Sequence, residues 1–592
     1  MGARDLRDAR SCAERGVNGV MKAVRGWPLA TLVLLMAAAV LLYRPLVQGA
    51  GSSHSYIFNA AWVLQFDEAL RHGAFPPRWL PNAFNGMGAP SFYYYPPLAF
   101  YVAAAVRGVL GAGADHAHII AWTAYVLTAA SGLTMFAWLR GKAGDAWALA
   151  GALAYVFAPY HQIDYFVRGS LGETAAYAVI PFVMLALERT AATWRWIPGL
   201  AFGYAALITA HLVIAMLVSI GVISIFAGYL VLQAPAEKRL AVMARGAAGG
   251  LLGLTMAASY LGPAVLMDSW ASLKWMWGDP AYDAYNWALL RPDLWPFRPF
   301  SEAMAWLGWG TGALGLAAIL AVVGKAAPER RKDVVLWGAI VLAGLILYAL
   351  PWVWRGPTGL LLGKAQFAYR LLLGMEFAAV TAVVLAASAG RWLRLLVLVA
   401  LCLIPLKHGY DMNAEDIAMN LVGRGDHNGT ISEQISKRYT PQEHLPAGVD
   451  ITSPRFADLA TMSGFADLPQ AAPLDPGAKV VKSGTMPDGT VIVILDAPRP
   501  TWVVLRRFYF PTWRAYRVRD GQDPVLPTQA HGRERLLAFQ AEAGAHTYRI
   551  RVERSALEKV CDAVSVLAIL TGLALLCLSL MERLKKIRKA AI

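Results

Sequence analysis

The fold of this chain is decided by residues 154–182, AYVFAPYHQIDYFVRGSLGETAAYAVIPF. Two apolar runs, 145–161 and 172–188, enclose a short stretch with Tyr, His, Asp, Arg and Glu side chains. Each run approaches the ~20 residues that a helix needs to cross the hydrocarbon core of a membrane. We therefore expect two transmembrane helices here, joined by a polar connection at one membrane surface.

The composition of the 592 residues extends this interpretation to the whole chain. Hydrophobic residues make up 57% and charged residues 16%, as expected for a polytopic α-helical membrane protein. The net charge of +15 does not indicate nucleic-acid binding, because the basic residues gather at the ends of apolar runs. The four cysteines lie outside the long hydrophilic segment, so neither a disulfide framework nor a zinc site is predicted.

Twelve apolar segments are predicted to span the membrane. They are 27–48, 117–138, 145–161, 172–188, 195–210, 212–233, 241–267, 303–325, 334–355, 366–388, 391–408 and 559–581. A thirteenth apolar segment, 93–110, would place every later basic loop on the outer side if it also crossed the membrane. We therefore expect it to be a re-entrant or interfacial helix packed against the outer face, with Pro96 and Pro97 at its start.

The basic loops set the predicted orientation, because cytoplasmic loops carry an excess of Lys and Arg. The predicted cytoplasmic segments are the basic tails 1–26 and 582–592 and the loops 139–144, 188–195, 234–239, 324–333 and 390–394. The predicted outer segments include the first outer loop 49–116, the polar stretch 158–173, the loops near 268–287 and 355–370, and the segment 409–558. Polar chemistry is thus expected at the extracytoplasmic face.

The hydrophilic segment 409–558 differs in composition from the rest of the chain. After a polar beginning, it contains five runs with the residues typical of short strands, separated by Gly, Pro, Asp and Asn. These are TVIVILDA (490–497), TWVVLRRFYF (501–510), RAYRVRDG (514–521), ERLLAFQA (534–541) and HTYRIRVE (546–553). A small antiparallel β domain, followed by the final transmembrane helix 559–581, is the predicted architecture.

The charged residues near the outer surface form the candidate site. Asp164 and Arg168 have the i, i+4 spacing of a helical ion pair, and Glu173 follows at the start of the next apolar run. Arg370 stands about one turn inside another apolar run, where an unpaired guanidinium is costly, so it is expected to meet a carboxylate or a phosphate. The alternative interpretation is a purely structural cluster of ion pairs.

Other outer-face residues complete the candidate list. Lys364 and Arg355, in one predicted outer loop, are expected to join Arg168 and Arg78 in a positive site for an anionic headgroup. His161 is interpreted first as a hydrogen-bonded residue at a helix end. Aromatic residues such as Trp79 either form an interfacial belt or stack on carbohydrate. The pattern from Tyr56 to Arg71 predicts a helix along the interface, which includes Asp67.

Four segments together resemble one bacterial family. They are HGAFPPRWLPNAFNGMGAPSFYYYPPLAFY (72–101), the segment 154–182, AQFAYRLL (365–372) and RRFYFPTWRAYRV (506–518). In this order they look like integral membrane proteins labelled 6-pyruvoyl-tetrahydropterin-synthase-related, close to the YfhO-type proteins of the GT-C glycosyltransferase superfamily. The resemblance runs from about residue 27 to the C-terminus. It implies a GT-C-like transmembrane domain over 27–408, a periplasmic β-rich domain over 409–558, and a bacterial inner-membrane location.

The resemblance also implies a reaction. GT-C enzymes generally take a sugar from a polyprenyl-phosphate carrier on the outer face and give it to an outer-face acceptor, with an acidic residue of an outer loop as the base. Glu173 or Asp164 is therefore nominated as the base, with Asp67 in reserve. The nominated phosphate ligands are Arg168, Arg370, Lys364 and Arg78. The nominated substrate-binding residues are His54, Tyr160, His161, Trp79 and Gln366.

The expected partners are the polyprenyl-phosphate sugar donor, an acceptor glycan or lipid, and membrane lipids. No cofactor is expected, and a divalent ion at the carboxylates would be detected by sensitivity of turnover to EDTA. Relatives usually carry an acidic residue directly after the first transmembrane helix, where this chain has GSSHSYIFN (51–59), with His54 as its titratable residue. The alternative function is therefore non-catalytic: a lipid-linked sugar transporter or an accessory subunit of a cell-envelope polysaccharide assembly complex.

Overall fold

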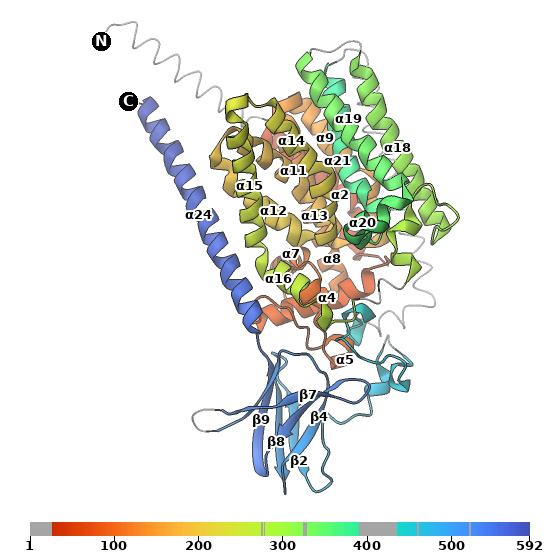
Figure 1. Cartoon of the computed structure of the whole chain (residues 1–592), viewed down its shortest axis with the longest axis vertical. Coiled ribbons are helices and arrows are strands. Elements are labelled where there is room, and N and C mark those ends of the chain that lie inside the picture. The colour runs from red at the N-terminus through yellow and green to blue at the C-terminus, as the bar shows by residue number, and fades with distance from the viewer. Residues whose placement is uncertain are drawn as a thin grey trace.

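The computed structural model describes residues 26–51, 53–273, 276, 279–323, 328–389, 435–458, 461–519 and 523–591. A body of helices forms most of the molecule, and the β-strands gather at one end of it (Figure 1). The last helix, α24 (Ala556–Ala591), runs along the side of the body and ends at the opposite end (Figure 1). The predicted fold is confirmed in a coarser form: it is mostly helical, with several apolar helices long enough to cross a membrane and a β-rich region before the last helix.

Among the described residues, seven helices are long and apolar enough to cross a membrane. They are α8 (His116–Ala143), α11 (Leu171–Ala192), the continuous α13 to α14 (Leu212–Gln233), α18 (Arg298–Val323), α19 (Pro328–Ala349), α21 (Leu371–Ala389) with the turn before it, and α24. Each corresponds to one of the predicted spans. The buried share is largest for the α21 span, at 94%, so this helix lies at the centre of the bundle.

The predicted number of twelve spans is not confirmed. Four other predicted segments are too short or too bent to count as single straight spans in the described chain: α2 (Trp27–Leu41) with α3 (Tyr43–Gln48), α9 (Asp145–Val156), α12 (Ile197–Ala210), and α15 (Arg239–Met256) with α16 (Ala258–Leu266). The last pair is bent by 71°, and counting it as one span gives eight. The predicted span 391–408 lies outside the described residues.

The first outer loop folds into helices that pack on one another. The predicted helix Tyr56–Arg71 is confirmed with these bounds as α4. The segment 93–110 becomes α6 (Ser91–Tyr94) and α7 (Leu98–Leu110), and the 13 residues of α7 extend only about 20 Å, less than the hydrocarbon core. Trp62 and Phe66 of α4 are fully buried against Phe100 of α7, with ring centroids 6.0 and 5.9 Å apart. Aromatic packing therefore joins α4 to α7.

The remaining short helices lie in the connections. The α-helical ones are α5 (Ala83–Gly86), α10 (Pro159–Ile163) and α20 (Gly356–Leu362). Two π-helical turns cover Asp164–Arg168 and Ser219–Ile223. Single 3-10 turns cover Trp194–Trp196, Ala236–Lys238, Asp268–Trp270, Pro280–Tyr282, Ala284–Trp287, Pro351–Trp354, Gly363–Ala365, Ala368–Arg370, Gln442–His444, Pro454–Phe456 and Ser463–Phe465.

Predicted cytoplasmic loops meet at the end of the body away from the strands. Lys142, in the last turn of α8, forms an ion pair of 2.5 Å with Glu188 near the end of α11. Arg195 forms one of 2.6 Å with Glu582, near the C-terminal end of α24. Basic residues thus lie in these connections at one end of the body, and the strands lie at the other end (Figure 1).

The β domain consists of two antiparallel sheets. The sheets have the strand orders β1-β4-β8-β7 and β2-β3-β9-β5-β6. The strands are β1 (Ala471–Pro473), β2 (Lys479–Thr485), β3 (Val491–Ala497), β4 (Thr501–Phe508), β5 (Trp513–Arg517), β6 (Val525–Leu526), β7 (Thr528–His531), β8 (Leu536–Ala541) and β9 (Gly544–Val552). The five predicted strands are confirmed as β3, β4, β5, β8 and β9. Alternate residues such as Val493 and Val503 are fully buried in the shared core, as a strand with one covered face requires.

Candidate functional site

Four charged side chains meet where three segments of the chain converge. Asp164 and Arg168 lie in the π-helical turn after α10, Glu173 lies in the first turn of α11, and Arg370 directly precedes α21. The carboxylates of Asp164 and Glu173 are completely buried, and the side chains of Arg168 and Arg370 are 11% and 8% exposed. We call these four residues the ion cluster.

Glu173 is bound on both of its oxygens. Its Oε2 lies 2.7 Å from Nη1 of Arg168 and accepts a hydrogen bond of 3.0 Å from the hydroxyl of Tyr160. Its Oε1 accepts a hydrogen bond of 2.9 Å from Nε of Arg370, and Nε2 of His211 lies 3.7 Å away. Opposite charge on both sides offsets the cost of burying this carboxylate.

Asp164 is held on one side only. Its Oδ1 pairs with Nη1 of Arg168, whereas its buried Oδ2 accepts no hydrogen bond from any described residue. Burial, reinforced by the negative charge of Glu173, raises the pKa of Asp164 well above its usual range, although Arg168 acts in the opposite direction. The raised pKa is the direction expected here, because Arg168 shares its charge between two carboxylates.

Each of the two arginines has a donor nitrogen, Nη2, that no described residue uses. Arg168 makes its polar contacts through Nη1. Arg370 donates through Nε to Glu173. Its Nη1 donates to the side-chain oxygen of Gln366 over 2.7 Å and to the carbonyl of Ala365 over 2.8 Å. No described residue accepts a hydrogen bond from Nη2 of either arginine. These N–H groups are the donors that an anionic ligand could reach.

The turn that presents Asp164 and Arg168 depends on Gly169. This glycine adopts the left-handed conformation (φ 64°), and the Ser170 N–H then donates back to the Asp164 carbonyl over 2.8 Å. Asn59 of α4 donates through its side-chain nitrogen to the carbonyl of Gly169 over 2.7 Å. The first outer loop therefore fixes the position of this turn.

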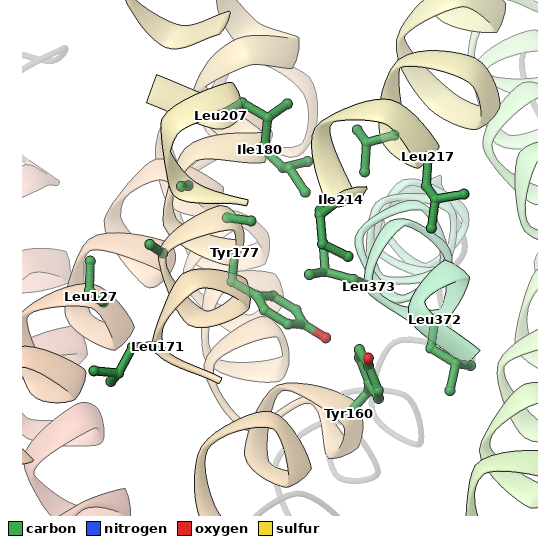
Figure 2. Close-up of a cluster of buried hydrophobic side chains, with 14 of the residues drawn as sticks. Leu127, Tyr160, Leu171, Tyr177, Ile180, Leu207, Ile214, Leu217, Leu372 and Leu373 are labelled. Carbon is green, nitrogen blue, oxygen red and sulfur yellow. The ribbon is translucent and has the colours of Figure 1, made fainter. Parts of the chain in front are cut away.

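A third carboxylate supports the cluster from α21. Glu376 accepts hydrogen bonds of 2.8 Å from the backbone N–H of Tyr160 and from the hydroxyl of Tyr177. Figure 2 shows Tyr160 and Tyr177 beside buried aliphatic side chains such as Ile214 and Leu373. Glu376 is absent from the predicted site, and the signal that points to it is a lone carboxylate inside the apolar run 371–389.

Several predicted substrate-binding residues lie beside the ion cluster. Tyr160 contacts it directly, and Gln366 contacts it through Arg370. His54 follows the first helical segment, and burial together with the charge of Arg168 lowers its pKa. Its backbone N–H donates to the carbonyl of Val167 over 3.0 Å. Lys364 is exposed in the 3-10 turn that supplies Ala365, the carbonyl partner of Arg370.

His161 points away from the cluster. Its ring stacks on Tyr177 with centroids 4.0 Å apart, and its Nδ1 lies 3.2 Å from the carbonyl of Tyr155, which only a ring N–H can satisfy. The buried Nε2 has no described hydrogen-bond partner. This geometry matches the first interpretation of His161, a hydrogen-bonded residue at a helix end.

The other three predicted residues lie elsewhere. Asp67 forms ion pairs with Arg71 and Arg107, at 2.6 and 2.7 Å. Arg78 binds the start of the last helix, through Glu558 at 3.3 Å and Asp562 at 2.6 Å. Trp79 packs on the aromatic rings Phe510 and Trp513 of the β domain. Each of these side chains joins parts of the chain that are distant in sequence, and none shares a described contact with the ion cluster.

Among the described residues, no group of three or more His, Cys, Asp and Glu side chains is arranged to hold a metal ion. Arg168 lies between Asp164 and Glu173, and Arg370 contacts the other oxygen of Glu173, so positive charge already neighbours both carboxylates. The chemistry of the cluster is therefore that of carboxylates and guanidinium groups.

Comparison with known proteins leaves the chain without an assigned relative. No protein-family model matches its sequence, and no curated protein matches it.

Proposed function

We propose that the protein is a membrane glycosyltransferase of the GT-C type. It transfers a sugar from a polyprenyl-phosphate-linked donor to an extracytoplasmic glycan, lipid or protein acceptor. The observation that carries the proposal is the ion cluster: two carboxylates and two arginines, from three segments of the chain, buried together with unused guanidinium donors. This combination provides a base and a phosphate ligand at one place.

In the proposed reaction, Arg168 and Arg370 hold the donor phosphate through their Nη2 groups. Phosphate oxygens match the planar guanidinium fork, and positive charge stabilises the phosphate as it leaves with the bonding electrons. The anomeric carbon gains oxocarbenium character and forms a bond to the acceptor oxygen. Tyr160 and Glu173 orient Arg168 for this role, since both contact its Nη1.

Of the two nominated bases, Asp164 has the better geometry. Both oxygens of Glu173 are occupied by cationic groups or a phenol, whereas Oδ2 of Asp164 has no described partner. A raised pKa also makes a carboxylate a stronger base. Asp164 accepts the proton of the acceptor hydroxyl, and Glu173 keeps the arginines in place.

A small apolar hollow adjoins Arg370. It lies between α13, the π-helical turn 219–223, α19 and α21, and Arg370 is its one charged lining residue. Its other lining residues are Leu217, Val218, Gly221, Val222, Ile340, Gly344, Leu347, Leu371, Gly374 and Met375. An amphiphile with an anionic head and an apolar chain matches such a surface, with the head at Arg370.

The finer architecture belongs to the same proposal. We place the β domain and the ion cluster on the periplasmic side of a bacterial inner membrane, and the basic loops in the cytoplasm. The chain then has twelve spans, with 391–408 as the eleventh and the bent pair α15 and α16 counted as one. The support for this placement is the separation of basic connections from the β domain along the molecule (Figure 1).

Transfer of radiolabelled sugar from a panel of polyprenyl-phosphate sugars tests the proposal. Purified protein in lipid nanodiscs is compared with Arg168→Gln and Arg370→Gln, each of which should lose about 100-fold or more in rate. Arg533→Gln is the control, because this arginine is 67% exposed and pairs with Asp450 over 2.6 Å in the segment before the last helix. Equal transfer by all four proteins would contradict the phosphate role.

The non-catalytic alternative also has an observation in its favour, namely the complete pairing of Glu173. A lipid-linked sugar transporter or an accessory subunit would bind donors through Arg168 and Arg370 without transferring the sugar. Donor binding that both Arg→Gln substitutions abolish, together with absence of transfer to every acceptor, would favour this alternative.

A further inference from the structure

Arg507 is a buried cation in the β domain, far in sequence from the ion cluster. It lies on β4 at an irregularity in the pairing with β8, between Val504 and Phe508. Arg507 is only 6% exposed. The next residue, Phe508, donates its backbone N–H to the carbonyl of Met87 over 2.8 Å, so the loop around residues 82–88 packs on this part of the strand.

The guanidinium of Arg507 has few partners. Nη2 donates to the hydroxyl oxygen of Thr485 over 2.8 Å, and the buried Nε has no hydrogen-bond partner among the described residues. No ion pair joins Arg507 to a carboxylate in the described part of the chain. A buried cation without a counter-charge is costly, and natural structures usually provide an anion for it.

The surroundings of Arg507 add donors and positive charge rather than acceptors. Burial and the neighbouring Arg506 lower the pKa of Arg507 to about 10. Thr485 accepts hydrogen bonds from both Arg507 and Gln470, which leaves its own hydroxyl hydrogen free to donate. Thr485 is exposed, so the site can be reached from solvent.

Gly86, in the first outer loop, lies next to the guanidinium of Arg507. It has φ +85°, and a Cβ at this position would lie 3.1 Å from Nη1 of Arg507. The guanidinium therefore approaches the backbone of the first outer loop at a place without a side chain. The two sides of the site come from the β domain and from this loop.

We propose that Arg507, with Arg506 and the hydroxyl of Thr485, forms a second anion site, which binds a phosphate group. The guanidinium of Arg507 supplies a planar fork for phosphate oxygens, the neighbouring Arg506 adds positive charge, and the hydroxyl of Thr485 supplies a further donor. The phosphate can belong to a soluble ligand or to a lipid headgroup. The inference stands on β-domain residues and does not depend on the transfer reaction.

Calorimetric titration of the full-length protein tests this site. In nanodiscs of phosphatidylcholine, the wild type should bind inorganic phosphate, and Arg507→Lys, which keeps the charge but loses the fork, should bind about 10-fold more weakly. Arg506→Gln and Thr485→Val change less buried groups and should each weaken binding about 10-fold. Lys479→Gln is the control for charge alone, since Lys479 is exposed on β2, and it should bind like the wild type.

A second arm identifies the source of the phosphate. If nanodiscs containing phosphatidylglycerol raise the melting temperature of the wild type but not of Arg506→Gln, and inorganic phosphate does not bind, the ligand is a lipid headgroup. If inorganic phosphate binds and depends on Arg506 and Thr485, the ligand is soluble. Absence of both effects, or equal effects in the wild type, Arg506→Gln and Thr485→Val, would overturn the proposal.

Discussion

Asp164 and Glu173 are nine residues apart, yet their surroundings give them different properties. Glu173 meets Arg168, Arg370 and Tyr160, whereas Asp164 shares Arg168 and leaves one buried oxygen without a described partner. Two carboxylates with different environments can take different roles, one as a fixed counter-charge and one as a group that exchanges a proton.

The first prediction concerns the stability of these two residues. Glu173→Gln leaves two buried arginines short of a counter-charge and should lower the free energy of unfolding by about 3 kcal/mol. Asp164→Asn leaves Arg168 paired with Glu173 and keeps a side-chain oxygen of similar size, so it should cost less, about 1 kcal/mol. Thermal unfolding in detergent measures the change in unfolding free energy for both variants. A larger loss for Asp164→Asn than for Glu173→Gln would contradict the role of Glu173 as the fixed counter-charge of the arginines.

The pH dependence of stability follows from the raised pKa of Asp164. Between the unfolded pKa of this group and its higher folded pKa, the folded protein binds more protons, so stability falls as the pH rises. The wild type should therefore lose stability relative to Asp164→Asn as the pH rises above the ordinary Asp pKa of about 4, by at most about 1.4 kcal/mol per pH unit. A difference that stays constant or has the opposite sign would rule out this protonation behaviour.

At the scale of elements, the turn between α10 and α11 positions the candidate site. Gly169 ends this turn with φ 64°, and a Cβ on it would lie 2.1 Å from Oγ of Ser53. Gly169→Ala therefore combines the cost of the left-handed conformation with a collision, and it should destabilise the protein by about 2 kcal/mol or more.

Gly73→Ala is the matched control for this turn. Gly73 has φ +84°, but no atom lies within 4 Å of the position of its Cβ. It should show only the conformational cost of about 1 kcal/mol. Thermal unfolding of the two variants separates the cost of the left-handed conformation from the cost of the collision with Ser53. Equal losses of unfolding free energy in the two variants would mean that the contact with Ser53 is unimportant.

The elements that were predicted correctly are those with a strong local pattern. Alternation of apolar residues predicts β3 and β4, and the spacing of Phe58, Trp62 and Phe66 predicts α4. The bend of 71° between α15 and α16 has no comparable signal, because the packing around Ser259 forms only in the folded chain. Strand β2 was missed because its run from Lys479 to Thr485 is polar and largely exposed.

In the candidate site, too, contacts between residues close in sequence could be predicted, whereas contacts that depend on tertiary packing could not. Asp164, Arg168 and Glu173 are close in sequence, and their association was predicted from spacing. Arg370 was predicted to need a counter-charge, but its partner, 197 positions away, depends on how α11 and α21 pack. Arg78 carries the same charge as Arg168 and was predicted to lie in the same site. Its contacts with the last helix depend on tertiary packing, which sequence spacing cannot predict.

At the scale of the whole molecule, the account assigns opposite sides of a membrane to the two ends of the body. Cysteines placed at Lys482 on β2 and at Arg331 near the start of α19, in a chain without native cysteines, should therefore differ in labelling. A membrane-impermeant maleimide added to intact cells should label Lys482→Cys and leave Arg331→Cys unlabelled until the membrane is permeabilised. Labelling of Arg331→Cys alone would reverse the orientation, and equal labelling would contradict a membrane between these positions.

The most direct test of the proposed transfer reaction is the single-turnover rate of Asp164→Asn with a donor that the wild type uses. Asp67→Asn is the control, since this carboxylate is also buried and paired with arginines but lies outside the ion cluster. The account predicts a loss of about 100-fold or more for Asp164→Asn and a rate near that of the wild type for Asp67→Asn. A folded Asp164→Asn protein that transfers sugar at the wild-type rate would contradict the role of Asp164 as the base.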